Sequence, residues 1–143
     1  MTITKKIEQG FGNGTNGLYD VLQNLNNVAC DAEFTIASSD PAVVTIQLKD
    51  YLGNDVAAAN SVMAWVSSTT TGLDPSALSG EIALTSSGDG AVLIHLTHYL
   101  YQLISEADGD IAVTITDTGT TAQYLTLLMP TGKLVVSTTL GFA

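Results

Sequence analysis

Two histidines three residues apart, His95 and His98, are the first candidates for metal chemistry in this chain of 143 residues. Imidazole nitrogens bind zinc well, but one ion needs both rings on the same side of the backbone. Residues three apart point to opposite faces of a strand, and only a helix would bring them to one face. The neighbouring β-branched and aromatic residues favour a strand. We therefore expect two ordinary strand histidines and no bound metal.

Acidic residues gather in two short segments that contain glycine, residues 50–55 (DYLGND) and residues 106–110 (EADGD). The second segment resembles the beginning of a calcium loop, in which carboxylates at alternating positions are followed by a bidentate glutamate. The later ligands of such a loop are missing, and Asp and Gly are also common in hairpin turns. The sequence therefore favours turns over cation sites in both segments.

No residue with nucleophilic chemistry stands in a catalytic setting. Cys30 is the single cysteine, has no neighbouring base or cation to activate it, and cannot form a disulfide within the chain. The chain contains neither a G-x-S-x-G turn nor a glycine-rich phosphate loop. None of the fourteen acidic residues is singled out as a pair for glycoside hydrolysis. We expect neither an enzyme nor a bound cofactor.

Aromatic side chains offer the remaining chemistry, because their faces stack on sugar rings when they are exposed. The candidates are Trp65, Tyr99, Tyr101 and Tyr124. Burial is the commoner position, since each aromatic ring removes a large area from water, and only 6% of the residues are aromatic. We expect core positions, with a sugar-binding surface as the alternative.

The elements that must position these residues are strands. In the stretch of residues 42–54 an apolar set of side chains alternates with a more polar set, which is typical of a half-buried strand. The apolar set is Val44, Ile46 and Leu48, and the opposite set is Val43, Thr45, Gln47 and Lys49. A turn at residues 53–55 and an apolar run at 56–66 then predict a second strand, and hence a hairpin.

The same unit recurs to the end of the chain. Short apolar runs are separated by turns rich in Gly, Ser, Asp and Pro, which favours antiparallel strands over βαβ units. Further strands are predicted at residues 33–37, 81–85, 91–97, 111–115, 123–129 and 134–140, and residues 99–105 continue the apolar pattern. This pattern of roughly eight strands predicts an all-β fold, either an antiparallel β-sandwich or a closed barrel.

One connection between the predicted strands is long. Residues 67–80 (SSTTTGLDPSALSG) have no regular period, and an irregular loop of this length in a compact domain is usually exposed and often functional. We expect Thr69, Thr70, Leu73 and Asp74 to form an exposed contact loop.

The first 31 residues differ in composition from the rest. Residues 1–17 contain two lysines and repeated glycines, a composition that gains little from packing. Residues 17–29 carry apolar residues at helical spacing and predict a short helix that packs on its own domain or on another subunit. We therefore divide the chain into an N-terminal arm and helix at 1–31 and a β-domain at 32–143. The predicted contact residues are Lys5, Lys6, Phe11, Leu18, Leu22 and Leu25.

Fourteen acidic residues against four lysines and no arginine give a formal charge of −10. Nucleic-acid binding depends on basic residues that neutralise phosphates, so neither DNA nor RNA is expected as a partner. An anionic membrane surface is disfavoured for the same reason, and no apolar run is long enough to span a bilayer. The start of the sequence lacks the apolar segment of a signal peptide, so we expect a soluble protein made in the cytoplasm.

Three segments resemble known proteins. Residues 44–58 (VTIQLKDYLGNDVAA) resemble the opening hairpin of bacterial immunoglobulin-like domains of the invasin and intimin type. Together with residues 106–116 (EADGDIAVTIT) and 124–137 (YLTLLMPTGKLVVS), they resemble a group of small virion proteins of tailed bacteriophages. The resemblance covers residues 42–143 and is looser in the middle, at residues 84–104.

This resemblance implies an immunoglobulin-like β-sandwich in a virion structural protein, in the first place a decoration (cement) protein that binds and stabilises the exterior of the phage head. The implied partners are the major capsid protein and neighbouring copies of the chain, with a trimer as one arrangement. The protein would be made in the host bacterial cytoplasm, and the resemblance supplies no catalytic residues. The alternative is a tail or head-fibre adhesion module that binds host surface carbohydrate.

Overall fold

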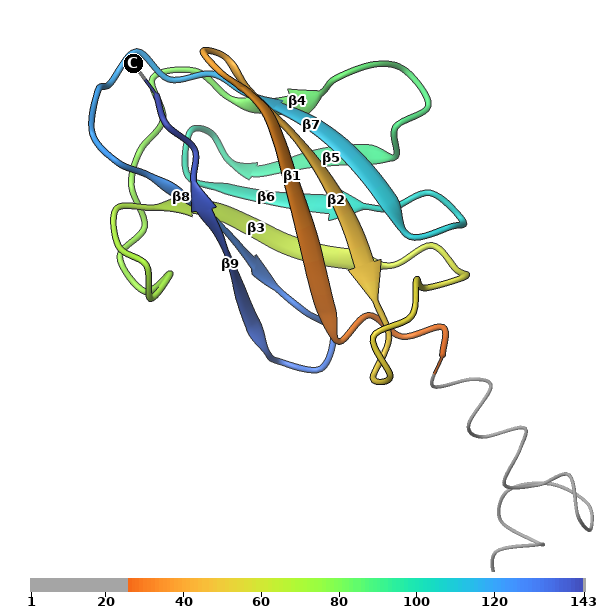
Figure 1. Ribbon diagram of the computed structural model, residues 1–143. Helices are drawn as coiled ribbons and strands as arrows, with labels where there is room; N and C mark the ends of the chain where they lie inside the picture. The colour runs from red at the N-terminus through yellow and green to blue at the C-terminus, as the bar shows by residue number, and fades with distance from the viewer. Residues whose placement is uncertain (1–25, 143) are drawn as a thin grey trace, which may run out of the picture.

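The computed structural model describes residues 26–142, which form nine β-strands and no helix (Figure 1). The strands are β1 (Asp31–Ser39), β2 (Ala42–Lys49), β3 (Ser61–Ser67), β4 (Ile82–Leu84), β5 (Ala91–Leu96), β6 (Leu100–Ile104), β7 (Asp110–Ile115), β8 (Tyr124–Leu128) and β9 (Leu134–Thr139). They make two antiparallel sheets, a four-stranded sheet with the order β1-β2-β7-β4 and a five-stranded sheet with the order β5-β6-β3-β8-β9.

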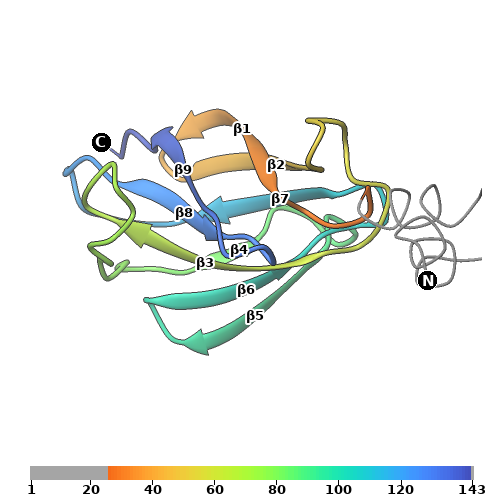
Figure 2. The same cartoon turned by 90° about the horizontal axis from the view of Figure 1, so that it is seen from below.

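The two sheets pack face to face as a sandwich of the immunoglobulin-like type (Figure 2). In such domains, strands A, B, E and D form one sheet, and strands C, F and G form the other. Here β1, β2, β7 and β4 take the places of A, B, E and D, while β3, β8 and β9 take those of C, F and G. The hairpin of β5 and β6 is an addition between D and E, and it extends the second sheet beyond strand C. The predicted sandwich is confirmed, and the barrel alternative is wrong.

Alternating apolar side chains from both sheets form the core. In β2, Val44, Ile46 and Leu48 are fully buried, and the residues between them face outward, as the alternation predicts. The five-stranded sheet contributes the inner residues of β3, β6 and β8. These are Val62, Ala64, Val66, Tyr101, Leu103, Leu125 and Leu127. Because a slip by one residue would turn each apolar set to the other face, this burial fixes the register of the strands.

β2 and β3 do not form the predicted hairpin. They belong to different sheets, so the chain crosses from one sheet to the other over residues 50–60. The predicted strand at 56–66 begins only with β3. Before it, the amide of Val56 donates to the carbonyl of Leu48 (3.1 Å), and Asn60 bonds the backbone of the entering N-terminal segment. These contacts keep the start of the run beside the end of β2 and tie Asn60 to the N-terminal segment, which an apolar run alone does not reveal.

The middle of the chain forms two strands where the sequence pattern predicted one strand and a continuation. A turn over residues 97–99 separates β5 from β6. His98 lies in this turn with a φ of 70°, so it is not a strand histidine as predicted. The predicted helix at 17–29 lies largely outside the described residues, and residues 26–28 form a turn and a bend.

The three segments that resemble phage proteins meet at one end of the sandwich. The amide of Leu48 donates to the carbonyl of Gly109 (2.9 Å), which ties the first segment to the second. The third segment reaches the same end through Lys133, whose ammonium group pairs with Asp31 at the start of β1 (2.8 Å). Segments far apart in the sequence therefore build one end of the domain together.

Two glycines between β4 and β5 test how closely the chain before β5 packs on β6, because they have nearly the same positive φ but different surroundings. φ is +104° at Gly88 and +103° at Gly90, where any side chain is strained. A Cβ at Gly88 would meet open space, whereas a Cβ at Gly90 would collide with the carbonyl oxygen of Ile104 in β6. We expect Gly90→Ala to lower the free energy of unfolding by about 2–5 kcal/mol, and Gly88→Ala by about 1–2 kcal/mol. Urea denaturation measures both, and equal losses would contradict the close approach of Gly90 to β6.

Candidate functional site

The two sheets differ in charge. No strand of the five-stranded sheet contains an Asp, Glu, Lys or Arg residue. The strands of the four-stranded sheet contain Asp31, Glu33, Lys49 and Asp110. The outer face of a sandwich sheet is normally polar, and the whole chain has a formal charge of −10. A complete sheet without charge therefore marks its outer face as the candidate site.

This uncharged outer face carries many large apolar side chains, together with a polar group in which Gln102 bonds both His95 and Ser61. The strand register places alternate side chains on it, opposite to the buried inner set. Its large apolar members include Met63, Trp65, Ile104, Leu128, Leu134 and Val136, all of them half-buried. The corresponding face of the four-stranded sheet presents Glu33, Thr35, Thr45, Gln47 and Asp110. We call the outer surface of the five-stranded sheet the apolar face.

The long loop between β3 and β4 folds back over part of the apolar face. The indole nitrogen of Trp65 donates a hydrogen bond to the carbonyl oxygen of Gly72 (2.8 Å). Gly72 has a φ of +74°, and a Cβ there would lie 2.7–3.0 Å from side-chain atoms of Thr126 and Val136. Thr126 belongs to the outer set of β8 but is fully buried beneath this loop. The loop is therefore packed on the sheet for part of its length.

The four predicted contact residues of this loop differ in exposure. Leu73 is 72% exposed and Thr70 is also exposed, so both are available to a partner. Thr69 is half-buried, and the carboxylate of Asp74 accepts a hydrogen bond from the hydroxyl of Ser68 (2.7 Å). Thr70, Leu73 and Asp74 are therefore the exposed residues of this set, and the Asp74 carboxylate also helps to hold the shape of the loop.

A groove with apolar walls lies beside this loop. Its volume is about 350 Å³, and it is lined by Trp65, Pro75, Leu96, Tyr99 and Leu100. Tyr99 is 43% exposed, so its ring remains accessible. Trp65 and Tyr99 come from β3 and from the turn before β6, and no sequence pattern indicated that they meet. An apolar side chain or the face of a ring matches this lining.

The other two aromatic candidates do not line this groove. Tyr101 is fully buried in the core, where burial raises the pKa of its hydroxyl group. Tyr124 is half-buried at the start of β8, opposite Ser67 of β3. Of the four aromatic residues considered for sugar binding, the structure brings Trp65 and Tyr99 together and places Tyr101 in the core.

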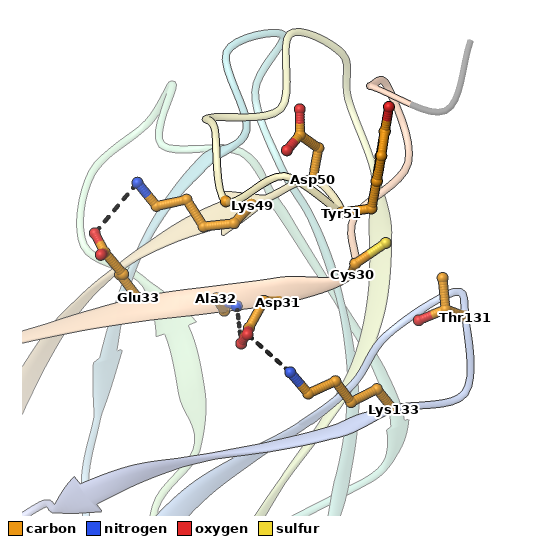
Figure 3. A pocket seen from close by; sticks show the side chains of 10 residues that line it. Cys30, Asp31, Ala32, Glu33, Lys49, Asp50, Tyr51, Thr131 and Lys133 are labelled. Carbon is orange, nitrogen blue, oxygen red and sulfur yellow. Dashed lines mark hydrogen bonds and ion pairs between the residues drawn. The ribbon is translucent and has the colours of Figure 1, made fainter. Parts of the chain in front are cut away.

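A polar cavity of about 490 Å³ lies at the end of the sandwich where β1 meets the turn between β8 and β9 (Figure 3). It contains both lysines of the described chain, and each is paired. Lys49 contacts Glu33 (3.2 Å) and Asp55, and Lys133 contacts Asp31 (2.8 Å). The hydrogen bond from Lys133 lowers the pKa of the Asp31 carboxyl group. Because carboxylates already neutralise both ammonium groups, this cavity does not favour an anionic ligand.

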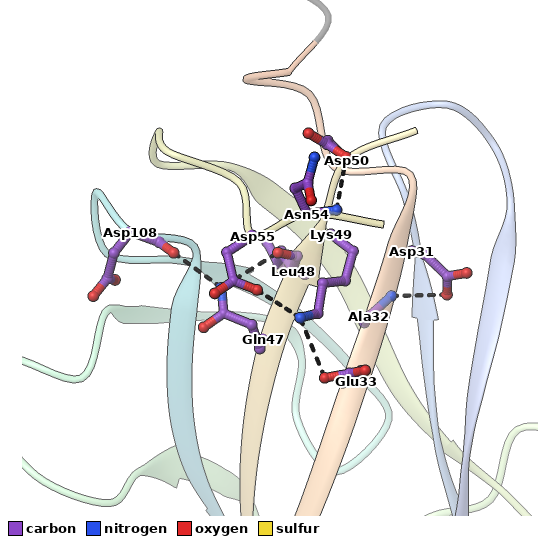
Figure 4. Close-up of polar contacts among 10 residues, drawn as sticks. All are labelled: Asp31, Ala32, Glu33, Gln47, Leu48, Lys49, Asp50, Asn54, Asp55 and Asp108. Atoms are coloured by element: carbon purple, nitrogen blue, oxygen red, sulfur yellow. Dashed lines mark hydrogen bonds and ion pairs between the residues drawn. The ribbon is translucent and has the colours of Figure 1, made fainter. Parts of the chain in front are cut away.

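The acidic turn residues bind neighbouring backbone groups and side-chain amides (Figure 4). A carboxylate oxygen of Asp50 accepts hydrogen bonds from the amides of Leu52 (2.8 Å) and Asn54 (3.0 Å). The carbonyl of Asp108 accepts one from the side-chain amide of Gln47 (2.9 Å). In both turns, these acidic residues are therefore bonded to other groups of the chain. In the described part of the chain, no three His, Cys, Asp or Glu side chains are grouped in a way that could hold a metal ion.

Each histidine has its own polar partner. Nε2 of His95 lies 2.8 Å from the side-chain oxygen of Gln102, and Nδ1 of His98 lies 2.7 Å from the carbonyl oxygen of Gly80. His98 therefore links the turn between β5 and β6 to the end of the long loop. His95 is exposed on β5.

The predicted contact residues of the N-terminal arm lie outside the described residues. They are Lys5, Lys6, Phe11, Leu18, Leu22 and Leu25. The point at which this segment joins the domain is described, because Asn60 donates to the carbonyl of Asn27 (2.8 Å) and accepts from the amide of Ala29 (3.0 Å). This junction lies at the end of the sandwich where the three resembling segments meet (Figure 1).

Asp117 anchors the end of the long loop and makes the stability of the fold depend on pH in the acidic range. Its carboxylate accepts hydrogen bonds from the amide of Ser79 (3.1 Å) and the side chain of Gln123 (2.8 Å). Burial raises the pKa of this carboxyl group, but the hydrogen bonds, led by that of the Ser79 amide, outweigh burial and lower the pKa overall. A lowered pKa in the folded state stabilises the fold above the unfolded value of about 3.9, and this stability is lost as the pH falls through the folded value.

We therefore expect Asp117→Asn to be less stable than the unchanged protein at neutral pH, with a difference that shrinks below about pH 4. Thermal melts followed by circular dichroism between neutral and acidic pH measure this difference. Thr118→Asn, at the exposed neighbouring position, is the control and should follow the unchanged protein. A difference that is constant across the pH range would contradict the role given to the carboxylate.

The described residues contain no helix that is long and apolar enough to cross a membrane. Comparison with protein families, with curated proteins and with solved structures finds no match to this chain. The description of the apolar face, of the loop packed on it and of the groove beside that loop therefore rests only on the contacts within this structure.

Proposed function

We propose that this protein is a structural attachment protein of a bacteriophage virion, in the first place a decoration protein that binds the exterior of the head and stabilises it. The observation that carries the proposal is the apolar face, a complete outer sheet surface without charge on an otherwise acidic domain. The resemblance of residues 44–58, 106–116 and 124–137 to phage virion proteins supplies the class of partner.

The apolar face has the composition of a surface that is covered in the assembled state. Burial of apolar area drives most protein association, and the central part of an interface is usually depleted of charged residues. Met63, Leu128 and Leu134 form such a centre on three adjacent strands. The charged face of the four-stranded sheet would then remain in water, where its acidic residues keep the particle surface soluble.

The N-terminal segment is a second element of the proposed attachment. It joins the domain at Asn60, at the end built by the three resembling segments. Lys5 and Lys6 carry half of the positive charge of the chain. We assign to residues 1–29 a contact with acidic surface of the major capsid protein or of a neighbouring copy. A trimer of copies on the capsid stays a prediction.

A charge placed on the apolar face tests the attachment. We expect Met63→Lys to lower the occupancy of the protein on capsids that lack it at least tenfold, because a desolvated ammonium group is costly at the centre of an interface. Val43→Lys is the matched control, since Val43 is half-buried at the outer face of the four-stranded sheet. Sedimentation of mixed protein and capsids, followed by quantification of the bound chain, measures occupancy.

The same assay tests the N-terminal segment through a chain that lacks residues 1–17, which should also bind less. Undiminished binding of that chain would remove the segment from the proposal. Undiminished binding of Met63→Lys would remove the apolar face, and equal loss with Val43→Lys would show that added charge acts without regard to position.

An adhesion module that binds host carbohydrate is the second candidate, and the groove between Trp65 and Tyr99 is the observation that favours it. Stacking of a sugar on aromatic rings suits this groove, but sugar sites also need polar groups that fix the hydroxyls, and the groove is lined by apolar and aromatic residues. This composition favours protein attachment over sugar binding.

A glycan array separates the two candidates. For the attachment protein we expect no saturable binding of any glycan. Saturable binding that is abolished by Tyr99→Ala but retained by Tyr51→Ala would establish the adhesion function instead. Tyr51 is a suitable control because it is 46% exposed at the other end of the domain.

A further inference from the structure

The four edge strands of the sandwich are not equally protected against pairing with another strand. β1 and β9 lie side by side, and the pair of Lys133 with Asp31 closes that side (2.8 Å). β4 is only three residues long. β5 is six residues long and, within the described residues, pairs only with β6. Proteins usually protect edges by charge, by proline, by short strands, by a covering element or by a bulge, and β5 has only the last of these, a register shift between Ile94 and Leu96.

β5 also exposes large aliphatic side chains on both of its faces. Leu93 belongs to the outer set, opposite Gln102, and is 49% exposed. Ile94 belongs to the inner set, opposite Tyr101, and is also 49% exposed. Residues 91–105 contain no charged side chain. A strand that is apolar on both faces and unpaired along one edge is a template for another strand.

The reason for this exposure is the inserted hairpin. β5 and β6 extend the five-stranded sheet beyond the four-stranded sheet, so β5 is only partly covered by β4 (Figure 2). A groove of about 280 Å³ remains between the two strands, with Ile82, Leu84, Val92 and Ile94 among its lining residues. Any strand that pairs with β5 would carry its own inner side chains toward this groove.

We propose that β5 pairs with β5 of a second copy of this chain, antiparallel and centred on Leu93, to join two five-stranded sheets into one continuous sheet. A two-fold axis perpendicular to the sheet keeps inner side chains on the inner side. Val92 then lies opposite Ile94 of the second copy beside the groove, and the two Leu93 side chains meet on the outer face. Over residues 92–94, apolar side chains face apolar side chains on both sides of the pair, and Ala91 lies opposite His95 of the second copy.

Charge limits where two copies of this chain can meet. Two domains with a formal charge of −10 repel one another over most of their surfaces, and residues 91–105 form a surface segment without charge. The interface is also self-complementary, so both copies use their free β5 edge and assembly stops at a pair. An edge of six residues buries less than the standard interface of about 1,600 Å², so the dimer is expected to be reversible.

The test uses the full chain and two opposite charges at the centre of the pair. We expect the unchanged protein to show a monomer–dimer equilibrium in sedimentation velocity. Leu93→Lys and Leu93→Glu should each weaken dimerisation at least tenfold, because like charges would face each other across the axis. An equimolar mixture of the two variants should form dimers again, because the opposite charges then pair. Leu52→Lys, a 64% exposed position in the turn after β2, should dimerise like the unchanged protein.

Three outcomes would overturn this proposal. One is a monomer at every soluble concentration, and another is a trimer that Leu93→Lys leaves intact. The third is a monomer whose amides at residues 91–96 exchange slowly in the full chain and quickly in a chain that lacks residues 1–17. In that case the N-terminal segment of the same chain would occupy the β5 edge. Leu93 itself lies on the apolar face, but these outcomes concern dimerisation only, because attachment to capsids is measured separately with Met63→Lys. Circular dichroism of each variant confirms folding.

Discussion

Burial of one side of each strand against the opposite sheet is the interaction on which the rest of the structure depends. Val44, Ile46 and Leu48 from one sheet and Leu125 and Leu127 from the other fill the space between the sheets. This packing fixes the register, and the register decides which residues face outward. The sandwich therefore presents two outer surfaces of independent composition, one charged and one apolar. An asymmetric surface of this kind suits a module that binds on one side and faces water on the other.

The end where the chain enters is built by turns that satisfy their own polar groups. Asp50 caps the turn that follows β2, and Gly109 lies so close to Val56 that a Cβ there would approach its carbonyl oxygen at 2.8 Å. Acidic residues and glycines in these segments thus have structural roles. Turns of this kind use the same residue types as cation loops, and this accounts for the resemblance. At the same end, Asn60 bonds the backbone of Asn27 and Ala29, where the N-terminal segment joins the domain.

The sequence predicted the strands, but it did not predict features that depend on contacts between distant segments. The strands from β4 onward lie within a few residues of the predicted runs, because each is a short apolar run bounded by turn residues. The hairpin predicted after β2 was wrong, because an apolar run at residues 56–66 does not show to which sheet it belongs. The apolar face was not predicted either, although the absence of charge in five strands was visible, because its outer residues are identified only by register. The meeting of Trp65 with Tyr99 depends on the path of the loop between β3 and β4, which has no periodic pattern.

The small number and the positions of the lysines, Lys49 and Lys133 in the described domain, have a practical consequence. They are the only basic residues after the sixth position, and each ammonium group is held by carboxylates at one end of the domain. Trypsin cleaves after lysine and arginine, so the folded domain offers this protease two sites, both beside strands. The segment from residue 50 to residue 133 would leave a complete digest as a single peptide. Detection of this chain in a mixture by mass spectrometry is therefore better served by a protease that cleaves at acidic or aromatic residues.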